Sequence, residues 1–229
     1  MAIGNSVNDE IKEQHRKVIE EMKPKDRFIY FFSYYKVHVL VILLFILLFS
    51  YIIYSNVTKK DVVLEVVYVN GFPSESTSAI MDDFSKTIDF NPKKEEVILD
   101  DSFYIASKNR TTYDDQNEQK LFLMASTGSI DVCIVDEAYF KHMAKQGNLL
   151  DLSTILTDDE MAIYKDRLFY YDSPENEPEG EEAIGLEVTD SPKLVKTNSF
   201  PNTKSYYCII MNSKNIDNAL AFLHYIELP

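Results

Sequence analysis

Cysteine, glycine and basic side chains are scarce in this chain of 229 residues, and tryptophan is absent. The two cysteines, Cys133 and Cys208, are too few for a disulfide framework, and neither has a cysteine or histidine partner at metal-ligand spacing. The 23 Lys and Arg residues are outnumbered by 37 Asp and Glu residues, which gives a net charge of -14 without any basic stripe. The composition therefore excludes a structural zinc site, and it excludes nucleic acid as a partner.

Motifs that carry catalysis are also missing. The six glycines form no phosphate-binding loop, and the chain has neither a Gly-x-Ser-x-Gly elbow nor a His-Glu-x-x-His pair. Beyond residue 55, the only histidines are His142 and His224, and both fall in predicted helices. We therefore expect no enzyme activity, no catalytic residue, no resident metal and no cofactor.

One long apolar run lies near the amino terminus. Val37 to Tyr54 reads VHVLVILLFILLFSYIIY without a formal charge. At about 1.5 Å per residue, the run spans roughly 27 Å, close to the thickness of a bilayer's hydrocarbon core. A buried helix of a soluble protein would need one polar face, which Val39 to Phe49 lacks. The sequence predicts a transmembrane helix over residues 37–56.

The charges that flank this run predict its orientation. The basic residues of the preceding twenty positions are Lys17, Lys23, Lys25, Arg27 and Lys36, and those of the following twenty are Lys59 and Lys60. Because the more positive flank stays in the cytoplasm, we expect residues 1–36 inside and an extracytoplasmic domain over residues 57–229. The long leader favours an uncleaved signal anchor, so the predicted location is the cell membrane, with a single pass.

Two polar segments lie outside the main pattern. Asn8 to Glu21 carries apolar residues at helical spacing, which predicts an amphipathic helix that ends before Pro24. Asp172 to Glu182 reads DSPENEPEGEE, and its acidic residues and prolines predict a mobile loop.

Strand and helix patterns alternate over the outer domain. The strands are expected at Val62–Val69, Val97–Leu99, Ile130–Val135, Ala183–Val188 and Tyr206–Met211. The helices are expected near Ile80–Ile88, Tyr113–Ser126, Glu137–Gln146, Thr157–Arg167 and after Asn215. Such alternation is typical of βαβ crossovers. The predicted fold class is α/β, a mainly parallel sheet with helices on both faces.

Several residues predict where these elements start and stop. Asp136 and Asn215 have the chemistry of helix caps, and Thr157 to Glu160 has the form of a capping box. Gly128 and Gly147 stand where helices end in a left-handed residue. The pair Asp100-Asp101 is expected to stop the second strand.

A family resemblance rests on the middle of this domain. The run TGSIDVCIVD at Thr127–Asp136 precedes Phe140, Ala144 and the segment GNLLDL at Gly147–Leu152. This order, with the strand and helix from Tyr206 to Leu223, resembles extracellular solute-binding proteins of ABC uptake systems. The layout, with YYK before the apolar run and KKD after it, resembles membrane-anchored proteins of clostridial-type Gram-positive bacteria.

The resemblance implies only part of that family's architecture. Its members insert a long second lobe before the returning strand, and here only Ser153–Ser205 is available for it. The resemblance therefore implies one lobe of a type II periplasmic-binding-protein-like fold, preceded by a single transmembrane helix. It also implies a membrane partner such as an ABC transporter subunit.

Candidate ligand-binding residues follow the predicted parallel strands. Ligands of such sheets bind beyond the carboxyl ends of the strands, where the strand order reverses. The residues expected there are Asn70, Gly71, Phe72, Asp101, Ser102, Asp136 and Glu137. Turn, strand-stop and cap chemistry explain the same residues without a ligand. A third interpretation is a divalent cation held by Asp100, Asp101, Asp136 and Glu137.

Both cysteines fall in apolar strands and are expected to be buried free thiols, unless those strands are neighbours and a disulfide joins them. For the whole chain, the leading hypothesis is a non-catalytic, membrane-anchored binding or accessory module. The alternatives are a tethered solute receptor of an ABC importer and an extracytoplasmic sensor partner.

Overall fold

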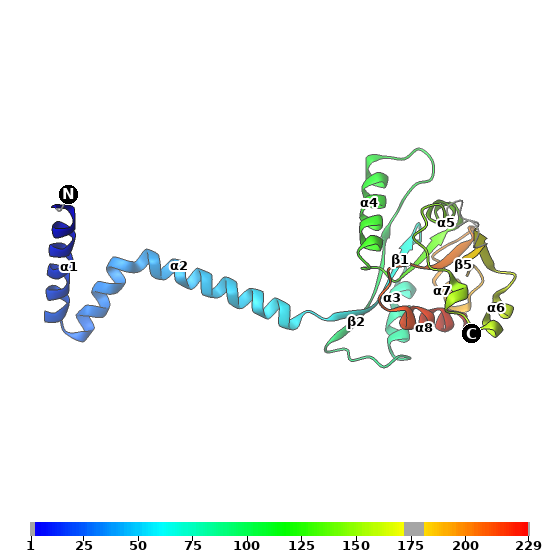
Figure 1. Ribbon diagram of the computed structural model, residues 1–229. Coiled ribbons are helices and arrows are strands. Elements are labelled where there is room, and N and C mark those ends of the chain that lie inside the picture. The colour runs from blue at the N-terminus through cyan, green and yellow to red at the C-terminus, as the bar shows by residue number, and fades with distance from the viewer. Residues whose placement is uncertain (1–2, 172–180, 229) are drawn as a thin grey trace. The chain divides into compact units, whose positions relative to one another are not determined.

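The computed structural model describes residues 3–171 and 181–228, and the chain divides into two compact units between Lys59 and Lys60. The first unit holds two helices, α1 (Ile3–Glu21) and α2 (Pro24–Thr58). The second unit is the α/β domain (Figure 1).

The turn between α1 and α2 is closed by a basic side chain. Pro24 lies in the first turn of α2, where a missing N–H breaks no helical hydrogen bond. The Arg27 guanidinium donates to the carbonyl oxygens of Glu20 at 2.6 Å and Met22 at 2.9 Å, so one carbonyl of the last turn of α1 and one of the turn after it have a donor. The predicted amphipathic helix is confirmed as α1, and Pro24 begins a second helix as well as limiting the first.

α2 is longer than the predicted transmembrane segment. Its stretch from Tyr35 to Thr58 is 24 residues with a mean hydropathy of 2.7, and none of its most apolar window is buried within the structure. By length and composition, this helix is able to cross a membrane.

The second unit is built on a six-stranded sheet of order β2-β1-β3-β6-β5-β4. Its strands are β1 (Asp61–Val69), β2 (Glu95–Phe103), β3 (Val132–Asp136), β4 (Leu168–Tyr171), β5 (Glu182–Glu187) and β6 (Ser205–Ile209). Its helices are α3 (Glu75–Ser85), α4 (Thr112–Ser126), α5 (Glu137–Ala144), α6 (Asp158–Tyr164), α7 (Pro192–Thr197), α8 (Ile216–Glu227) and the 3-10 helix η1 (Leu152–Thr154). The α/β class is confirmed, and β4 and α7 are elements that the sequence did not predict.

The sheet is mixed, so the prediction of a mainly parallel sheet is wrong. β1 pairs in parallel with β2 and β3, whereas the β3–β6, β6–β5 and β5–β4 pairs are antiparallel. The direction of these strands could not be predicted because helices cover both faces of the sheet. A strand that is buried on both sides is an apolar run in whichever direction it is read, so its residues do not indicate whether it pairs in parallel or antiparallel.

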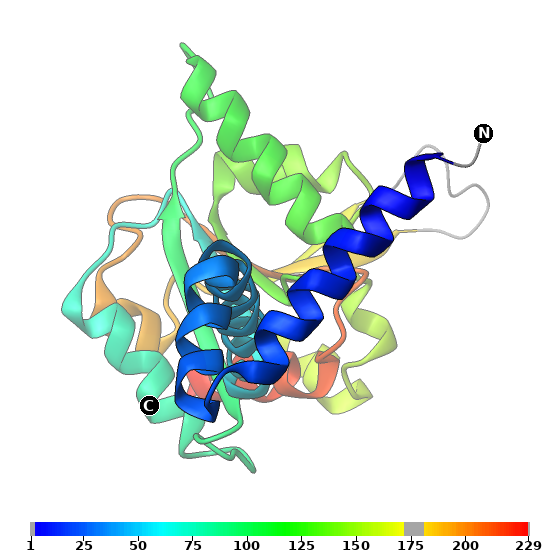
Figure 2. The same ribbon diagram turned by 90° about the vertical axis from the view of Figure 1, so that its left-hand side faces the viewer.

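The two faces of the sheet carry separate apolar cores. On one face, α3, α6, α7 and α8 pack over strand residues such as Leu64, Val66 and Tyr207. On the other, α4 and α5 pack over residues such as Val67 and Cys133. Figures 1 and 2 show these helices in two layers with the sheet between them. Helices on both faces are therefore confirmed.

β2 and β4 form the two edges of the sheet. Contrary to the prediction, the Asp100-Asp101 pair does not stop β2, which continues to Phe103. Val67 pairs with Asp100 and Val69 with Phe103, so two residues of β2 lie opposite the single Tyr68. This bulge keeps the acidic residues on the strand and returns Phe103 to the core. The acidic residues along this edge strand are Glu95, Glu96, Asp100 and Asp101.

Most of the predicted helix boundaries are confirmed. Asp136 accepts a hydrogen bond from the Tyr139 N–H and caps α5, and Thr157 forms a capping box with Glu160. Gly128 and Gly147 have positive φ of 62° and 69°. Asn215 stands at the start of α8 but makes no side-chain cap bond, because its amide binds elsewhere. The predicted mobile loop lies almost wholly at 172–180, outside the described residues.

Candidate functional site

The carboxyl ends of β1, β2 and β3 lie at the same edge of the sheet. From β1 the chain passes to β2 on one side and then returns to β3 on the other side, so the strand order reverses between β1 and β3. This reversal is where α/β sheets bind their ligands. All of the predicted site residues lie at or near these strand ends.

Asn70 connects the three strands. It has a left-handed backbone with φ 62°, which asparagine tolerates better than most residues. Its side-chain Nδ2 donates to the Ile105 carbonyl at 3.0 Å, and its Oδ1 accepts from the Ile105 N–H at 2.7 Å. Nδ2 also donates to Asp136 Oδ1 at 3.2 Å. We call Asn70, Ile105 and Asp136 the carboxyl-end junction, in which polar groups predicted to face a ligand bind one another.

Asp136 and Glu137 are occupied by the start of α5. Asp136 Oδ1 accepts the Tyr139 N–H at 3.0 Å in addition to the Asn70 amide. The Glu137 backbone donates to the Lys204 carbonyl at 3.0 Å, and its carboxylate pairs with Lys141 at 2.6 Å. The hydrogen bond and charge of Lys141 lower the pKa of Glu137. Both residues stay at the predicted edge in structural roles.

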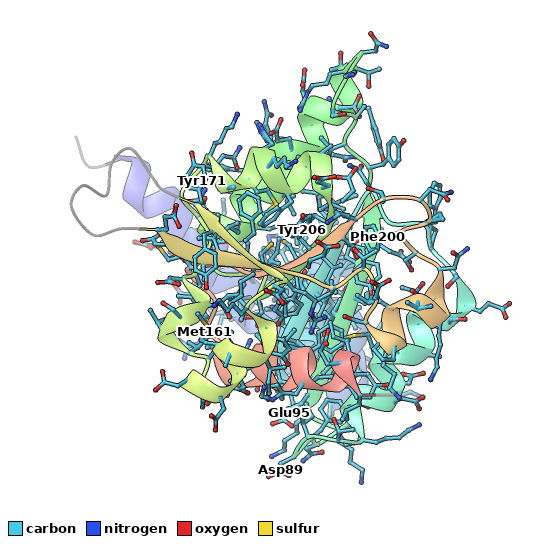
Figure 3. The ribbon with its side chains drawn as sticks, turned by 90° about the vertical axis from the view of Figure 1, so that its right-hand side faces the viewer. Asp89, Glu95, Met161, Tyr171, Phe200 and Tyr206 are labelled. Carbon is cyan, nitrogen blue, oxygen red and sulfur yellow. The ribbon has the colours of Figure 1, made fainter. Side chains whose placement is uncertain are left out.

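Gly71 and Phe72 form the turn after β1. A Cβ on Gly71 would lie 2.9 Å from the ring of Phe200, so any larger residue here would have to displace that ring. The Phe72 N–H donates to the Ser199 carbonyl at 2.7 Å, and the Phe72 side chain is 58% exposed. In Figure 3, Phe200 lies on the loop that leads into β6, the strand that carries Tyr206. The turn therefore presents an aromatic ring to solvent at this edge.

Asp101 and Ser102 lie inside β2, on the bulge, rather than after the strand. The Ser102 N–H and hydroxyl donate to Asp100 Oδ1 at 2.9 Å and 2.5 Å. Asp101 faces Tyr68 closely enough that its charge, after the larger effect of burial, raises the pKa of that phenol. These residues are near the edge but apart from the contacts of the carboxyl-end junction.

Two features of this edge were not predicted from the sequence. Asp114 accepts the Ala106 N–H at 2.8 Å and the Thr111 N–H at 2.7 Å, so it fixes the segment after β2 next to Ile105. The Thr111 to Asp114 spacing is a capping-box pattern that could have indicated it. The second is Tyr68, whose buried hydroxyl has no hydrogen-bond partner within the described part of the chain.

A second polar cluster lies at the opposite end of β3. The buried Asp131 carboxylate accepts the Glu65 N–H at 2.9 Å, the Ser213 hydroxyl at 2.7 Å and the Asn215 amide at 3.0 Å. We call this group the amino-end junction. The sequence offered one signal for it, an aspartate between the apolar residues Ile130 and Val132.

The acidic residues do not gather as the cation hypothesis requires. Over residues 3–171 and 181–228, no group of three or more His, Cys, Asp or Glu side chains is arranged to hold a metal ion. Asp100 is engaged by Ser102, and Glu137 by Lys141. The hypothesis of a divalent cation at this edge is therefore left without a cluster to support it.

No protein-family model matches the chain, and no curated protein matches it. A solved structure described as "substrate binding domain of putative molybdenum ABC transporter from Clostridium difficile" is similar to it at 12% identity and a TM-score of 0.35, over 73% of this chain and 93% of that chain. So low a similarity identifies neither a family nor a function for this chain.

Proposed function

We propose that this chain is a single-pass membrane protein whose α/β domain lies outside the cytoplasm and serves as a non-catalytic binding or accessory module. The observation that carries the proposal is the apolar stretch of α2 from Tyr35 to Thr58, which is long and apolar enough to cross a membrane. Burying a large apolar side chain is worth about 1.5–3 kcal/mol, so a bilayer stabilises this helix by tens of kcal/mol.

The basic flank supports the orientation. Lys23, Lys25 and Arg27 stand before the apolar stretch, and Lys36 lies at its start, whereas Lys59 and Lys60 follow it. The positive flank is retained in the cytoplasm, so residues 1–36 are inside and residues 57–229 are outside. In this arrangement the domain is one lobe of a type II periplasmic-binding-protein-like fold, tethered at its first strand.

The edge of the sheet where β1, β2 and β3 end favours a module that binds another protein over one that encloses a small solute. Asn70 and Asp136 bind each other across the reversal of strand order, where a solute would otherwise bind. At the same edge, the rings of Phe72 and Tyr104 are 58% and 56% exposed. Exposed aromatic rings are typical anchors of protein interfaces. The surface around Phe72 and Tyr104 is therefore the proposed contact with a membrane protein partner.

The first experiment determines topology. A cysteine-reactive, membrane-impermeant label is applied to intact cells that carry a single added cysteine at Lys214 or at Lys12, in a chain whose two native cysteines are alanine. Labelling at position 214 and protection at position 12 supports the proposal. The reverse pattern overturns it.

The second experiment seeks the partner. A photo-crosslinking phenylalanine analogue replaces Phe72 or Tyr104 in the native membrane, and Ile163, which is 73% exposed on α6, serves as the matched control. Crosslinks to a membrane protein at Phe72 and Tyr104 but not at Ile163 support the proposed surface. Capture of a transporter permease would instead favour a tethered solute receptor, and capture of a signalling protein would favour a sensor partner.

A melting experiment on the full chain separates binding of a solute from binding of a protein. A solute at a hundred times its dissociation constant raises stability by about 2.7 kcal/mol, which a melting curve resolves. Sugars, amino acids, oligopeptides and divalent cations are the panel. Absence of any shift supports the protein-binding module, and a hydrolytic activity that Asp101→Asn or Asp136→Asn abolishes would overturn the proposal.

A further inference from the structure

β3 and β6 are the strands that join the parallel half of the sheet to its antiparallel half. Cys133 of β3 lies directly opposite Cys208 of β6 in this pairing. Both are thiols in this structure and both are completely buried. The Cys208 thiol donates to the Cys133 carbonyl at 3.4 Å, which places its sulfur against the partner residue.

The hydrogen bonds around the pair define its geometry. The Ile210 N–H donates to the Asp131 carbonyl at 3.0 Å, and the Glu137 N–H donates to the Lys204 carbonyl at 3.0 Å. Because such bonds recur at every second residue, Cys133 and Cys208 also occupy a hydrogen-bonded position, with Cα atoms about 5.5 Å apart. Disulfides join residues whose Cα atoms are about 4.4–6.8 Å apart, so the backbone spacing of this pair is within reach of one. The Cβ atoms of directly opposite residues are about 4.5–5.5 Å apart, so the two side chains must draw together to the roughly 3.5–4.5 Å that the bond needs.

A narrow pocket between α4 and α5 borders one of the two cysteines. Cys133 contributes to its lining together with Leu121 and Ala125 of α4 and with Tyr139 and Met143 of α5. Cys208 is absent from this lining. Because both cysteines are completely buried, a reagent reaches either sulfur only when the packing of α4 and α5 opens, and Cys133 is the cysteine that borders this pocket.

We propose that Cys133 and Cys208 are a disulfide-forming pair, and that the bond covalently joins the two halves of the sheet. The oxidant is a small disulfide or the disulfide of a thiol oxidoreductase. Cys133 attacks one oxidant sulfur as the thiolate, loses its proton to solvent, and forms a mixed disulfide while the first thiol leaves. Cys208 then attacks the Cys133 sulfur, loses its proton, and expels the second thiol. Two electrons pass to the oxidant, whose disulfide becomes two thiols.

Burial affects the rate of this reaction more than its outcome. Hydrogen bonding to Cys133 and burial raise the pKa of the Cys208 thiol well above its usual range. Since the thiolate is the attacking form, the second step is slow in the folded domain and fast while the chain is still folding. The bond closes a long loop between positions 133 and 208, so it is expected to raise the melting temperature by roughly 5–15 °C.

The test uses the full chain in detergent and bis(2-hydroxyethyl) disulfide as the probe. The folded protein, and a sample refolded from urea with the probe present, are denatured and alkylated, and the mass is measured. The expected result is no alkylated thiol in the wild type and a melting temperature that falls on reduction. Two alkylated thiols in both samples would overturn the proposal.

The single variants identify the reactive sulfur and control for folding. Without denaturant, where labelling requires local opening, Cys208→Ala should acquire the probe at Cys133 faster than Cys133→Ala acquires it at Cys208, because Cys133 is the one of the two that borders the pocket between α4 and α5. The double alanine variant should melt at the same temperature with and without reductant. Equal rates for the two single variants would contradict the order of steps. These measurements do not depend on which side of a membrane the domain occupies.

Discussion

The two polar junctions at opposite ends of β3 hold the same strands by different chemistry. The amino-end junction is centred on the buried carboxylate of Asp131, which accepts donors from β1 and from the segment before α8. The carboxyl-end junction is centred on the neutral amide of Asn70, which both donates and accepts. A buried charge tolerates few substitutions, whereas an amide at a partly exposed edge tolerates more.

The difference teaches where this domain has room for function. The Asp131 carboxylate uses its hydrogen bonds to join β1 to the segment before α8, so the amino-end junction offers it to no outside ligand. The Asn70 end also holds the strands together, but aromatic rings at the same edge remain exposed. Substitutions at the first junction should therefore affect folding alone, and those at the second should affect folding less and binding more.

Among substitutions at the two junctions, Asp131→Ala is expected to have the largest effect on stability. The change leaves the Glu65 N–H and the side chains of Ser213 and Asn215, all partly buried, without their acceptor. We expect a loss of about 3–5 kcal/mol in the free energy of unfolding. Urea unfolding of the full chain in detergent, followed by circular dichroism, measures it. Asp131→Asn keeps the shape and one acceptor and should lose less than half as much; equal losses would show that the hydrogen bonds matter little.

Asn70→Ala should be the next largest change. It removes the bonds to Ile105 and Asp136 and places an alanine at φ 62°, for an expected loss of about 2–4 kcal/mol. Asn70→Gly removes the same bonds but accepts the backbone, so the difference between the two variants measures the strain, about 1 kcal/mol. If glycine is as damaging as alanine, backbone conformation is not the reason for asparagine at this position.

Asp136 offers a finer test of the same junction. Asp136→Ala removes the cap of α5 together with the acceptor of the Asn70 amide, and we expect a loss of about 1–2 kcal/mol. Asp136→Ser keeps a capping oxygen that is too short to reach Asn70. The difference between the losses of the Ala and Ser variants, measured by the same unfolding curves, gives the contribution of the cap. If the two losses are equal, the whole effect belongs to the contact with Asn70.

The smallest effect is one of pH, and it concerns Asp114 beside the carboxyl-end junction. Hydrogen bonds from the Ala106 N–H and from the hydroxyl and N–H of Thr111 lower the pKa of Asp114 to about 2, from a usual value of 3.8. A lowered pKa means that the folded state favours the carboxylate, so this stabilisation is complete above pH 3.8 and is lost as the pH falls toward 2. Melting curves should show a shallower acid dependence for Asp114→Asn than for the wild type. Identical acid dependence would contradict the role of these bonds.

Local chemistry was predictable from the sequence, and pairing between distant segments was not. The Asp136 cap and the capping box at Thr157 depend on three or four neighbouring residues, so their positions were predicted correctly. The direction of β6 depends on where the chain returns, and its apolar residues fit either direction. β4 was missed because its four residues, Leu168 to Tyr171, are too few for a period to be recognised.

The candidate site shows the same division. Asn70 and Asp136 were expected at one edge, and they do meet there. Their hydrogen bond to each other could not be predicted, because it depends on the register between β1 and β3. Asp101 and Ser102 were misplaced because a bulge, not the end of a strand, accounts for the acidic pair.

The acidic residues of the edge strand β2 affect how neighbouring copies of the chain interact. In the proposed membrane location, neighbouring molecules diffuse in two dimensions and their sheets collide often. An unpaired strand edge is a template on which another sheet can grow. The carboxylates of Glu95, Glu96, Asp100 and Asp101 line that edge, and two such edges would bring like charges together. Mutual repulsion would thus keep a crowded layer of these domains from polymerising through their sheets.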